Sequence, residues 1–325
     1  MERLDAFMAR ANAAYYAARD PFADFTTAPE ISQAFGEVLG LWAAVTWQAM
    51  GSPDPVILAE AGPGRGTLMA DALRAIARAV PAFRAALRLH LVETSPRLRA
   101  LQAGRLPGAV WHDRIADLPA GPLILIGNEF LDALPIRQFL RRGAGWAERW
   151  VADGAFAERP ADAPEPPCPP ATEDEVVEIC EPARALAAAL GARLVAQGGA
   201  ALFVDYGPAA SMAGDSLQAL RDGAPAPPLA DPGTADLTAH VDFAALATLA
   251  RAAGAAAQGP VPQGLFLARL GLPQRVEALA RTQPPAAAAA LLAGTRRLTE
   301  PHAMGRLFKA LALCHPALPS LPGFA

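Results

Sequence analysis

The sequence predicts an α/β protein built on a mostly parallel sheet with helices on both faces. Short apolar runs alternate with helical patterns between residues 55 and 205, which is the order of elements in a parallel sheet. The runs at 122–128 and 200–205 are almost wholly apolar and end in polar residues, as strands buried on both faces do. The run at 55–60 leads into a glycine loop and a helical pattern, an arrangement that holds nucleotide-like ligands.

Composition restricts the classes to which this chain can belong. Its 325 residues are 53% hydrophobic and 18% charged, which is typical of a globular protein and not of a disordered one. The net charge is −4, and the 28 basic residues, all arginine except Lys309, form no block. A nucleic-acid partner is therefore not expected. The excess of arginine, alanine and proline indicates GC-rich coding and a bacterial source.

Cysteine usage and the apolar runs indicate the cellular context. Cys168, Cys180 and Cys314 are odd in number, and their spacing fits neither a disulfide framework nor a metal site. No apolar run is long enough to span a membrane, and the N-terminus carries acids instead of a signal peptide. We therefore expect no metal, no membrane insertion and a cytoplasmic location.

The first fifty residues, 1–50, are expected to form a helical cap. One helix is predicted near residues 2–18, with a break at Pro21. A second helix is predicted from Ile31 to about Met50. Pro29 lies near its first position, and Thr26 or Thr27 would be its N-cap.

The core is expected over residues 51–270, with strands at 55–60, 87–93, 109–112, 122–128 and 200–205. Two insertions interrupt it, at about 131–197 and 207–240. The first contains a predicted hairpin at 136–151, a proline-rich surface loop at 160–170 and a helix near 181–197. Both insertions follow strands at the carboxyl edge, where ligands bind in open α/β sheets. We therefore expect them to form the substrate platform.

The end of the chain is expected to be helical. A helix is predicted at 241–253, and 264–270 is a candidate edge strand that closes the sheet. Residues 271–325 are then expected to form a C-terminal helical extension packed on the core.

The glycine loop carries the strongest functional signal. The strand at 55–60 ends in a carboxylate, and the residues that define the loop are Glu60, Gly62, Pro63, Gly64 and Gly66. A dinucleotide fingerprint requires glycine or alanine where this chain has Thr67. The spacing instead resembles motif I of class I S-adenosylmethionine-dependent methyltransferases. Glycines allow close approach of the backbone to a ligand, and Glu60 could accept a hydrogen bond from a cationic amino group. The alternative is a tight turn that binds no ligand.

Two further strand ends carry polar candidates. Glu93 ends the strand at 87–93, where a carboxylate can bind ribose hydroxyls, and it favours the cofactor interpretation over a bare turn. Asn128, Glu129 and Asp132 follow the strand at 122–128, with Asp205 on the next strand. An amide and carboxylates there can orient a nucleophilic nitrogen, and carboxylates suit a guanidinium in particular. Asp132 could equally cap the following turn.

Several strings extend the resemblance to one family, the MidA-like methyltransferases, which includes a mitochondrial complex I assembly factor. These strings are D-F-T-T-A-P-E-I-S-Q-A-F-G-E at 24–37, E-A-G-P-G-R-G-T-L-M-A-D at 60–71, L-V-E-T-S-P at 91–96, N-E-F-L-D-A-L-P at 128–135, F-V-D-Y-G at 203–207 and P-G-T-A-D-L-T-A-H-V-D-F at 232–243. The match covers nearly the whole chain.

The resemblance implies a Rossmann-like fold with a mostly parallel seven-stranded sheet, and S-adenosyl-L-methionine as cofactor. It also implies methylation of an arginine in a complex I peripheral-arm subunit, in support of complex I assembly. The segment over the cofactor would contribute Thr27, Pro29, Glu30, Ser32 and Gln33. Asp205, Tyr206 and His240 are candidates for substrate contact, although a lone histidine more often makes structural hydrogen bonds. A homodimer is compatible with the sequence, which does not determine the oligomeric state.

The chain departs from the family in the short loop from Pro21 to Asp24 and at Pro208, where members often carry a histidine. A further family histidine before residue 232 is also missing. Two alternatives to arginine methylation therefore stay open. One is a methyltransferase that acts on a small molecule or an amide nitrogen, and the other is a non-catalytic assembly chaperone.

Overall fold

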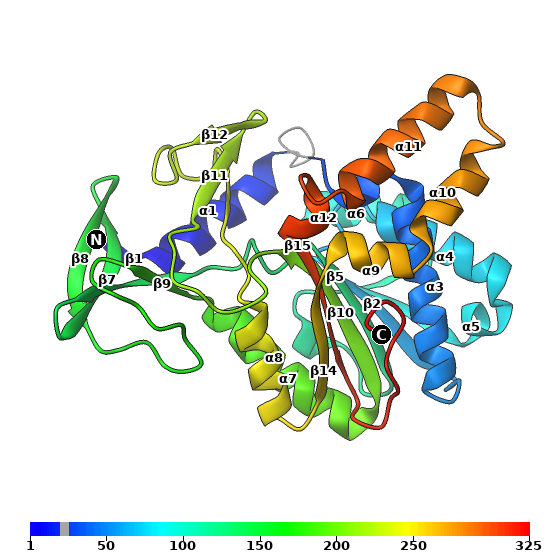
Figure 1. Cartoon of the computed structure of the whole chain (residues 1–325), viewed down its shortest axis with the longest axis horizontal. Coiled ribbons are helices and arrows are strands. Elements are labelled where there is room, and N and C mark those ends of the chain that lie inside the picture. The colour runs from blue at the N-terminus through cyan, green and yellow to red at the C-terminus, as the bar shows by residue number, and fades with distance from the viewer. Residues whose placement is uncertain (20–25) are drawn as a thin grey trace.

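The computed structural model describes residues 1–19 and 26–325, so the expected break at Pro21 and the short loop to Asp24 lie outside the described residues. The central sheet has the order β14-β15-β10-β5-β2-β3-β4 (Figure 1). Its strands are β2 (Val56–Ala61), β3 (Leu87–Val92), β4 (Val110–His112), β5 (Leu123–Asn128), β10 (Gly199–Tyr206), β14 (Ala256–Pro262) and β15 (Phe308–Cys314). The sheet confirms the predicted α/β class with seven strands. The five strands that the sequence predicts correspond to β2, β3, β4, β5 and β10.

The order of the strands reverses between β2 and β5. The chain builds β2, β3 and β4 outward in one direction and then returns to place β5 on the other side of β2. All pairs from β4 to β10 are parallel, whereas β15 is antiparallel to both of its neighbours. In open α/β sheets, ligands bind outside the carboxyl ends of strands at such a reversal. The topology therefore predicts a site above β2 and β5.

Helices cover both faces of the central sheet because alternate strand residues are apolar on each side. Val56 and Leu58 of β2 face a core that includes α3 (Gln33–Ala49), α4 (Thr67–Ala79), α5 (Pro81–Ala86) and α10 (Leu272–Ala280). Ile57 and Ala59 face the opposite core, which includes α7 (Glu181–Gln197) and α8 (Phe243–Ala252). This alternation is the period-two pattern of a strand buried on both faces.

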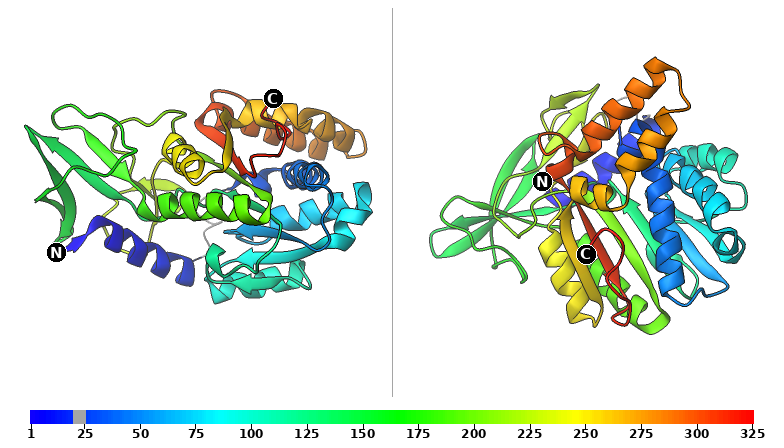
Figure 2. Two further views of the ribbon diagram at one scale, coloured as in Figure 1. Left: turned by 90° about the horizontal axis from the view of Figure 1, so that it is seen from below. Right: turned by 45° about the vertical axis from the view of Figure 1, so that its right-hand side comes forward.

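The insertions form two small sheets beside the central one (Figures 1 and 2). One sheet contains β1 (Glu2–Arg3), β6 (Arg137–Arg142), β7 (Gly145–Ala152), β8 (Ala155–Ala161) and β9 (Val176–Ile179), and β6 and β7 are the predicted hairpin. The other contains β11 (Gln218–Arg221), β12 (Ala224–Ala226) and β13 (Asp236–Thr238). Helix α1 (Leu4–Ala18) packs on these insertions, since Leu4 and Phe7 share a core with Ile136 and Leu237. The segment 1–50 thus divides between the insertions and the main sheet.

Two predictions near the C-terminus are wrong. Residues 264–270 were expected to form an edge strand, but α9 (Gln263–Arg269) is a helix and the edge strand is β14. The tail was expected to be helical, and α10, α11 (Pro285–Thr299) and α12 (Met304–Leu307) are helices, but β15 inserts between β10 and β14. Its alanines and leucines favour a helix by propensity, and burial between two strands overrides that preference. Part of the 271–325 segment therefore belongs to the core sheet.

The start of the second N-terminal helix also differs in detail. Thr27 is the N-cap of a short helix, α2 (Ala28–Ile31), and Ser32 caps the long α3 by accepting a hydrogen bond from the Ala34 N–H at 3.3 Å. Within the described residues, no helix has both the length and the apolar character that crossing a membrane requires.

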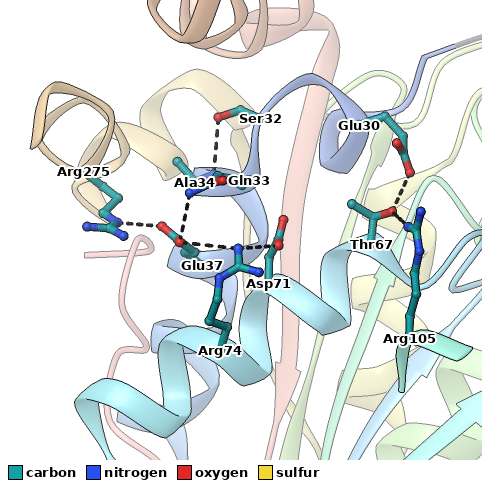
Figure 3. A network of polar contacts seen from close by, with 10 residues as sticks. All are labelled: Glu30, Ser32, Gln33, Ala34, Glu37, Thr67, Asp71, Arg74, Arg105 and Arg275. Carbon is teal, nitrogen blue, oxygen red and sulfur yellow. Dashed lines mark hydrogen bonds and ion pairs between the residues drawn. The ribbon is translucent and has the colours of Figure 1, made fainter. Parts of the chain in front are cut away.

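A buried carboxylate connects three helices on one side of the sheet. Glu37 of α3 is 3% exposed, and it accepts a hydrogen bond from Arg275 of α10 at 2.6 Å. Arg74 of α4 lies 3.7 Å from the same carboxylate and also bonds Asp71 (Figure 3). The C-terminal helices are thereby tied to the helices that follow the glycine loop.

We expect Glu37→Ala to lower the free energy of unfolding by about 1–3 kcal/mol, because it leaves two guanidinium groups without their shared partner. Chemical denaturation measures the change. Glu277→Ala is the matched control, since its ion pair with Arg281 is solvent-exposed and worth only about 0.3–0.5 kcal/mol. Equal effects of the two substitutions would contradict a structural role for Glu37.

Candidate functional site

A cavity of about 1240 Å³ opens at the carboxyl ends of β2, β3 and β5, where the strand order reverses. The two strand ends on either side of the reversal line it, together with α1, α7 and the segment before α3. The predicted site residues that line this cavity are Glu60, Gly62, Pro63, Gly64, Glu93, Thr27, Pro29, Glu30, Asn128 and Glu129. The structure therefore brings the predicted cofactor and acceptor residues into one space.

The glycine loop turns sharply beneath the cavity. Gly62, Gly64 and Gly66 have φ angles of 66°, 52° and 77°, in the left-handed region that favours glycine. A Cβ on Gly62 would lie 3.0 Å from the Phe130 ring, so a side chain here would also crowd Phe130. Gly66 is the N-cap of α4 and packs against Leu106 instead of lining the cavity. Its role in the described structure is to begin the helix.

Glu60 is a buried acceptor at the end of β2. The residue is 2% exposed, and its Oε2 makes no hydrogen bond within the part of the chain that the structure describes. Burial raises the pKa of its carboxyl to about 8, since the charged form is desolvated. An uncompensated buried carboxylate is costly, so this position fits a ligand that brings a cation or a donor.

Glu93 is held in place by its neighbours at the end of β3. Its Oε1 accepts a hydrogen bond from the Ser95 N–H at 2.8 Å, and its Oε2 accepts one from Gln102 Nε2 at 3.3 Å. Gln102 also donates to the Gly64 carbonyl at 2.7 Å and accepts from Trp111 at 2.8 Å. Burial raises the pKa of Glu93, and these donors oppose the increase. Gln102, which the sequence analysis missed, thus joins the glycine loop to Glu93.

Asn128 and Glu129 present acceptors to the same cavity. Asn128 Nδ2 donates to Glu129 Oε1 at 2.9 Å. Asn128 Oδ1, the other polar atom of this side chain, has no partner among the described residues. Glu129 Oε1 also accepts from the Ala28 N–H at 2.9 Å. Burial raises the pKa of Glu129 to about 7 against these two donors. Its φ of 50° is unusual for a residue with a side chain, and such strain is concentrated at functional sites.

Asp205 fixes the loop that carries Glu129. Its Oδ2 accepts hydrogen bonds from the backbone N–H groups of Phe130, Leu131 and Asp132 at 3.1, 2.8 and 3.3 Å. Its Oδ1 accepts from the Tyr206 N–H at 2.9 Å. Burial raises the pKa of Asp205 to about 6, although these four donors stabilise its anion. Asp205 was a candidate for substrate contact, but its carboxylate is turned toward the backbone and away from the cavity lining.

The other predicted residues surround the site without lining the described cavity. Asp132 is buried, and burial together with Asp205 and Asp236 holds its pKa well above the usual range. Tyr206 donates to Thr238 at 2.5 Å and its ring contacts His240, whose pKa is lowered by burial. Ser32 caps α3, and Gln33 Nε2 lies 3.4 Å from Glu37.

The segment at residues 27–30 is bound to both sides of the cavity. Its Ala28 N–H donates to Glu129, and Glu30 accepts from Thr67 Oγ1 at 2.6 Å. Arg105 donates to the same Thr67 hydroxyl at 2.6 Å (Figure 3). The segment is thus positioned by the acceptor loop and by the first residue of α4.

Helix α1 contributes polar residues to the cavity that the sequence did not predict there. Asn12 and Tyr16 line the cavity from this helix, and Tyr16 donates to Asp236 at 2.8 Å. Asn12 forms hydrogen bonds with both the N–H and the carbonyl of Leu237. A polar residue beside buried Ala11 and Met8 was the available signal, because buried polar side chains require partners. Asp113 and Arg114 after β4 were missed as well, although they too follow a parallel strand.

Known proteins resemble this chain over most of its length. Residues 38–261 match a family described as "Putative S-adenosyl-L-methionine-dependent methyltransferase". Protein arginine methyltransferase NDUFAF7 homolog of Drosophila melanogaster is 35% identical over 93% of this chain and 78% of its own length. The human protein arginine methyltransferase NDUFAF7 is 33% identical over 92% of this chain and 76% of its own length. Both are described as mitochondrial.

Solved structures agree over nearly the whole chain. A Burkholderia thailandensis protein crystallised with S-adenosylhomocysteine is 27% identical and superimposes with a TM-score of 0.81. The alignment covers 99% of this chain and 89% of that protein. A native crystal structure from the same organism gives the same TM-score at 28% identity and covers 90% of that chain.

We expect Glu60→Gln to stabilise the ligand-free protein and to weaken cofactor binding. Burial raises the pKa of the Glu60 carboxyl to about 8 in the folded protein, above its ordinary value of about 4.5 in an unfolded chain. Between pH 4.5 and pH 8 the Glu60 carboxyl is therefore protonated in the folded state and ionised in the unfolded state. Because the unfolded state binds fewer protons, the free energy of unfolding of the wild type decreases as pH rises through this window. The variant lacks this decrease, so its advantage should grow from pH 5 to pH 8.5.

Thermal unfolding at several pH values and calorimetry with S-adenosylhomocysteine measure the two effects. Glu165→Gln, at an exposed loop position, is the control and should change neither quantity. A Glu60→Gln variant that matches wild-type affinity and shows no pH-dependent gain in stability would contradict this assignment.

Proposed function

Because the chain belongs to this family of S-adenosyl-L-methionine-dependent methyltransferases, we propose that it methylates an arginine side chain of a protein. The names of its relatives support protein arginine as the acceptor. The observation that carries the proposal is the set of acceptors at the end of β5. Asn128 Oδ1 has no partner within the described residues, and Glu129 adds a carboxylate beside it. A guanidinium, with five N–H donors in a plane, satisfies such a group of oxygens.

The residues present also fit the cofactor. S-adenosylmethionine supplies a methyl group activated by a sulfonium sulfur. Glu60 would accept a hydrogen bond from its amino group, and Glu93 would bind its ribose hydroxyls. Gly62 and Gly64 would allow the backbone to approach the ligand. Thr27, Pro29 and Glu30 would cover it, since they line the same cavity.

Orientation of the acceptor is the main task that this proposal gives to the protein. Glu129 would bind the guanidinium and concentrate the guanidinium charge away from the reacting nitrogen. Asn128 Oδ1 would align the reacting nitrogen by accepting a hydrogen bond from the N–H of that nitrogen. Asp205 would act indirectly, because its hydrogen bonds to residues 130–132 position the loop. Asp132, Tyr206 and His240 would then support the wall of the site.

The proposal also includes the acceptor protein and the compartment in which methyl transfer occurs. The family resemblance supports a peripheral-arm subunit of complex I as the acceptor, and assembly of that complex as the purpose. The odd number of cysteines, whose spacing fits no disulfide framework, supports the cytoplasm as the place where this occurs. A small-molecule or amide acceptor and a purely structural assembly role are the outcomes that the experiment must separate.

Transfer of a radioactive methyl group tests the proposal. Purified protein is incubated with labelled S-adenosylmethionine and an extract from cells that lack this gene. We expect label on one protein, recovered as methylarginine after hydrolysis. Glu129→Gln should bind S-adenosylhomocysteine within about threefold of wild type but transfer methyl groups at least ~100-fold more slowly.

The control variant is Glu277→Gln, on an exposed helix far in sequence from the site, and it should transfer at the wild-type rate. Label in small molecules or on an amide would overturn the arginine assignment. Cofactor binding without any transfer would favour the assembly role.

A further inference from the structure

Asp236, in the segment 232–243, is connected to the cavity by a hydrogen bond from a residue of α1. Asp236 begins β13 and is 4% exposed. Its Oδ1 accepts a hydrogen bond from the Tyr16 hydroxyl at 2.8 Å. Tyr16 in turn lines the cavity together with Asn128 and Glu129. A residue from an insertion and one from the N-terminal helix thus meet at the methyl-acceptor space.

The position of Tyr16 is fixed on both sides. One turn earlier, Asn12 donates to the carbonyls of Leu237 and Ala133 at 2.8 and 3.1 Å, and it accepts from the Leu237 N–H at 3.0 Å. The Tyr16 carbonyl accepts a hydrogen bond from Ser95 Oγ at 3.2 Å. The helix is therefore held to β13 and to the loop after β3, so the phenol has a defined place above the cavity.

The hydrogen bond to Asp236 determines which chemistry the hydroxyl presents. A phenol has one proton, and Asp236 accepts it. A phenol oxygen keeps two lone pairs when it donates, so Tyr16, which lines the cavity with Asn128 and Glu129, can also accept a hydrogen bond from a group bound there. Tyr16, Asn128 and Glu129 thus line one cavity with hydrogen-bond acceptors. Such a cavity favours a substrate group that carries N–H donors and disfavours a carboxylate or a phenolate anion.

We propose that Tyr16 and Asp236 accept the proton that leaves the acceptor nitrogen during methyl transfer, an inference that rests on the proposed function. The nitrogen forms a bond to the methyl carbon, and the carbon–sulfur bond breaks with its electron pair going to sulfur. The nitrogen's proton passes to Tyr16 Oη as the phenolic proton passes to Asp236 Oδ1. The carboxylate becomes a carboxylic acid and returns its proton to solvent after product release.

The surrounding charges favour proton uptake at this pair. Asp132 and Asp205 lie in the same buried region as Asp236, and burial together with repulsion from Asp205 and Asp236 raises the pKa of Asp132 well above its usual range. Burial and the nearby Asp236 and Asp132 carboxylates also raise the pKa of Tyr16. The phenol therefore does not ionise by itself but transmits a proton while staying neutral. Placing a proton on such a cluster reduces like-charge repulsion.

Tyr16→Phe tests the pair because it keeps the ring and removes the hydroxyl. We expect kcat to fall by about 100-fold, within the range that general acid–base groups contribute, with affinity for S-adenosylhomocysteine within twofold of wild type. Asp236→Asn, which cannot receive the proton, should show a loss of similar size. In both variants the rate should increase with pH up to pH 9.5, because hydroxide must then remove the proton.

The matched control is Tyr15→Phe, which removes a hydroxyl from the same helix at a residue buried in the core. It should keep the wild-type kcat and pH profile. The inference is overturned if Tyr16→Phe keeps kcat within twofold, or if Tyr15→Phe loses as much activity with the same pH profile. If Asp236→Asn does not fold, Tyr16→Phe alone decides.

The comparison also separates this inference from the proposed function. Rates are measured with the acceptor that wild-type protein methylates, so a non-arginine acceptor overturns the arginine assignment while the Tyr16→Phe ratio still tests the pair. Wild-type protein that transfers no methyl group to any acceptor overturns both.

Discussion

The reversal of strand order between β2 and β5 is the constraint on which the rest of the structure depends. It places Glu60 at one strand end and Asn128 with Glu129 at the next, across a shared opening. The chain leaves β2 for α4 on one face of the sheet and leaves β5 for the insertion and α7 on the other face, so an opening remains between the two strand ends. Among the residues that the structure describes, Glu60 Oε2 and Asn128 Oδ1 thus stay buried without a donor, a costly state that a cationic cofactor and a guanidinium would relieve.

The insertions and terminal segments make this opening specific. Asp205 holds the loop after β5 through three backbone N–H groups, and the segment before α3 is anchored on Glu129 and Thr67. Helix α1 is held beside the cavity by hydrogen bonds from Asn12 to Leu237 and from Tyr16 to Asp236. Each of these elements is tied to the cavity by a polar contact and not by apolar packing alone. The geometry of the site thus depends on hydrogen bonds from parts of the chain outside the sheet.

Local patterns predict much of this arrangement. Strands β2, β3, β5 and β10 are apolar runs with polar ends, and the glycine loop marks the cofactor strand. Strand β15 was missed because its helix-favouring residues become a strand only through pairing with β10 and β14. Tyr16 and Gln102 could not be found from spacing, since their functional partners, Asp236 and Glu93, come from distant segments. Long-range hydrogen bonds leave no local periodicity.

A crystal structure with bound S-adenosylhomocysteine is the most direct test of this account. The account predicts that the ligand occupies the cavity above β2 and β5, with its amino group within hydrogen-bonding distance of Glu60 and its ribose hydroxyls on Glu93. The side of the cavity formed by Asn128, Glu129 and Tyr16 should stay open for the acceptor. A ligand bound elsewhere, or one that leaves Glu60 Oε2 without a donor, would contradict the central claim.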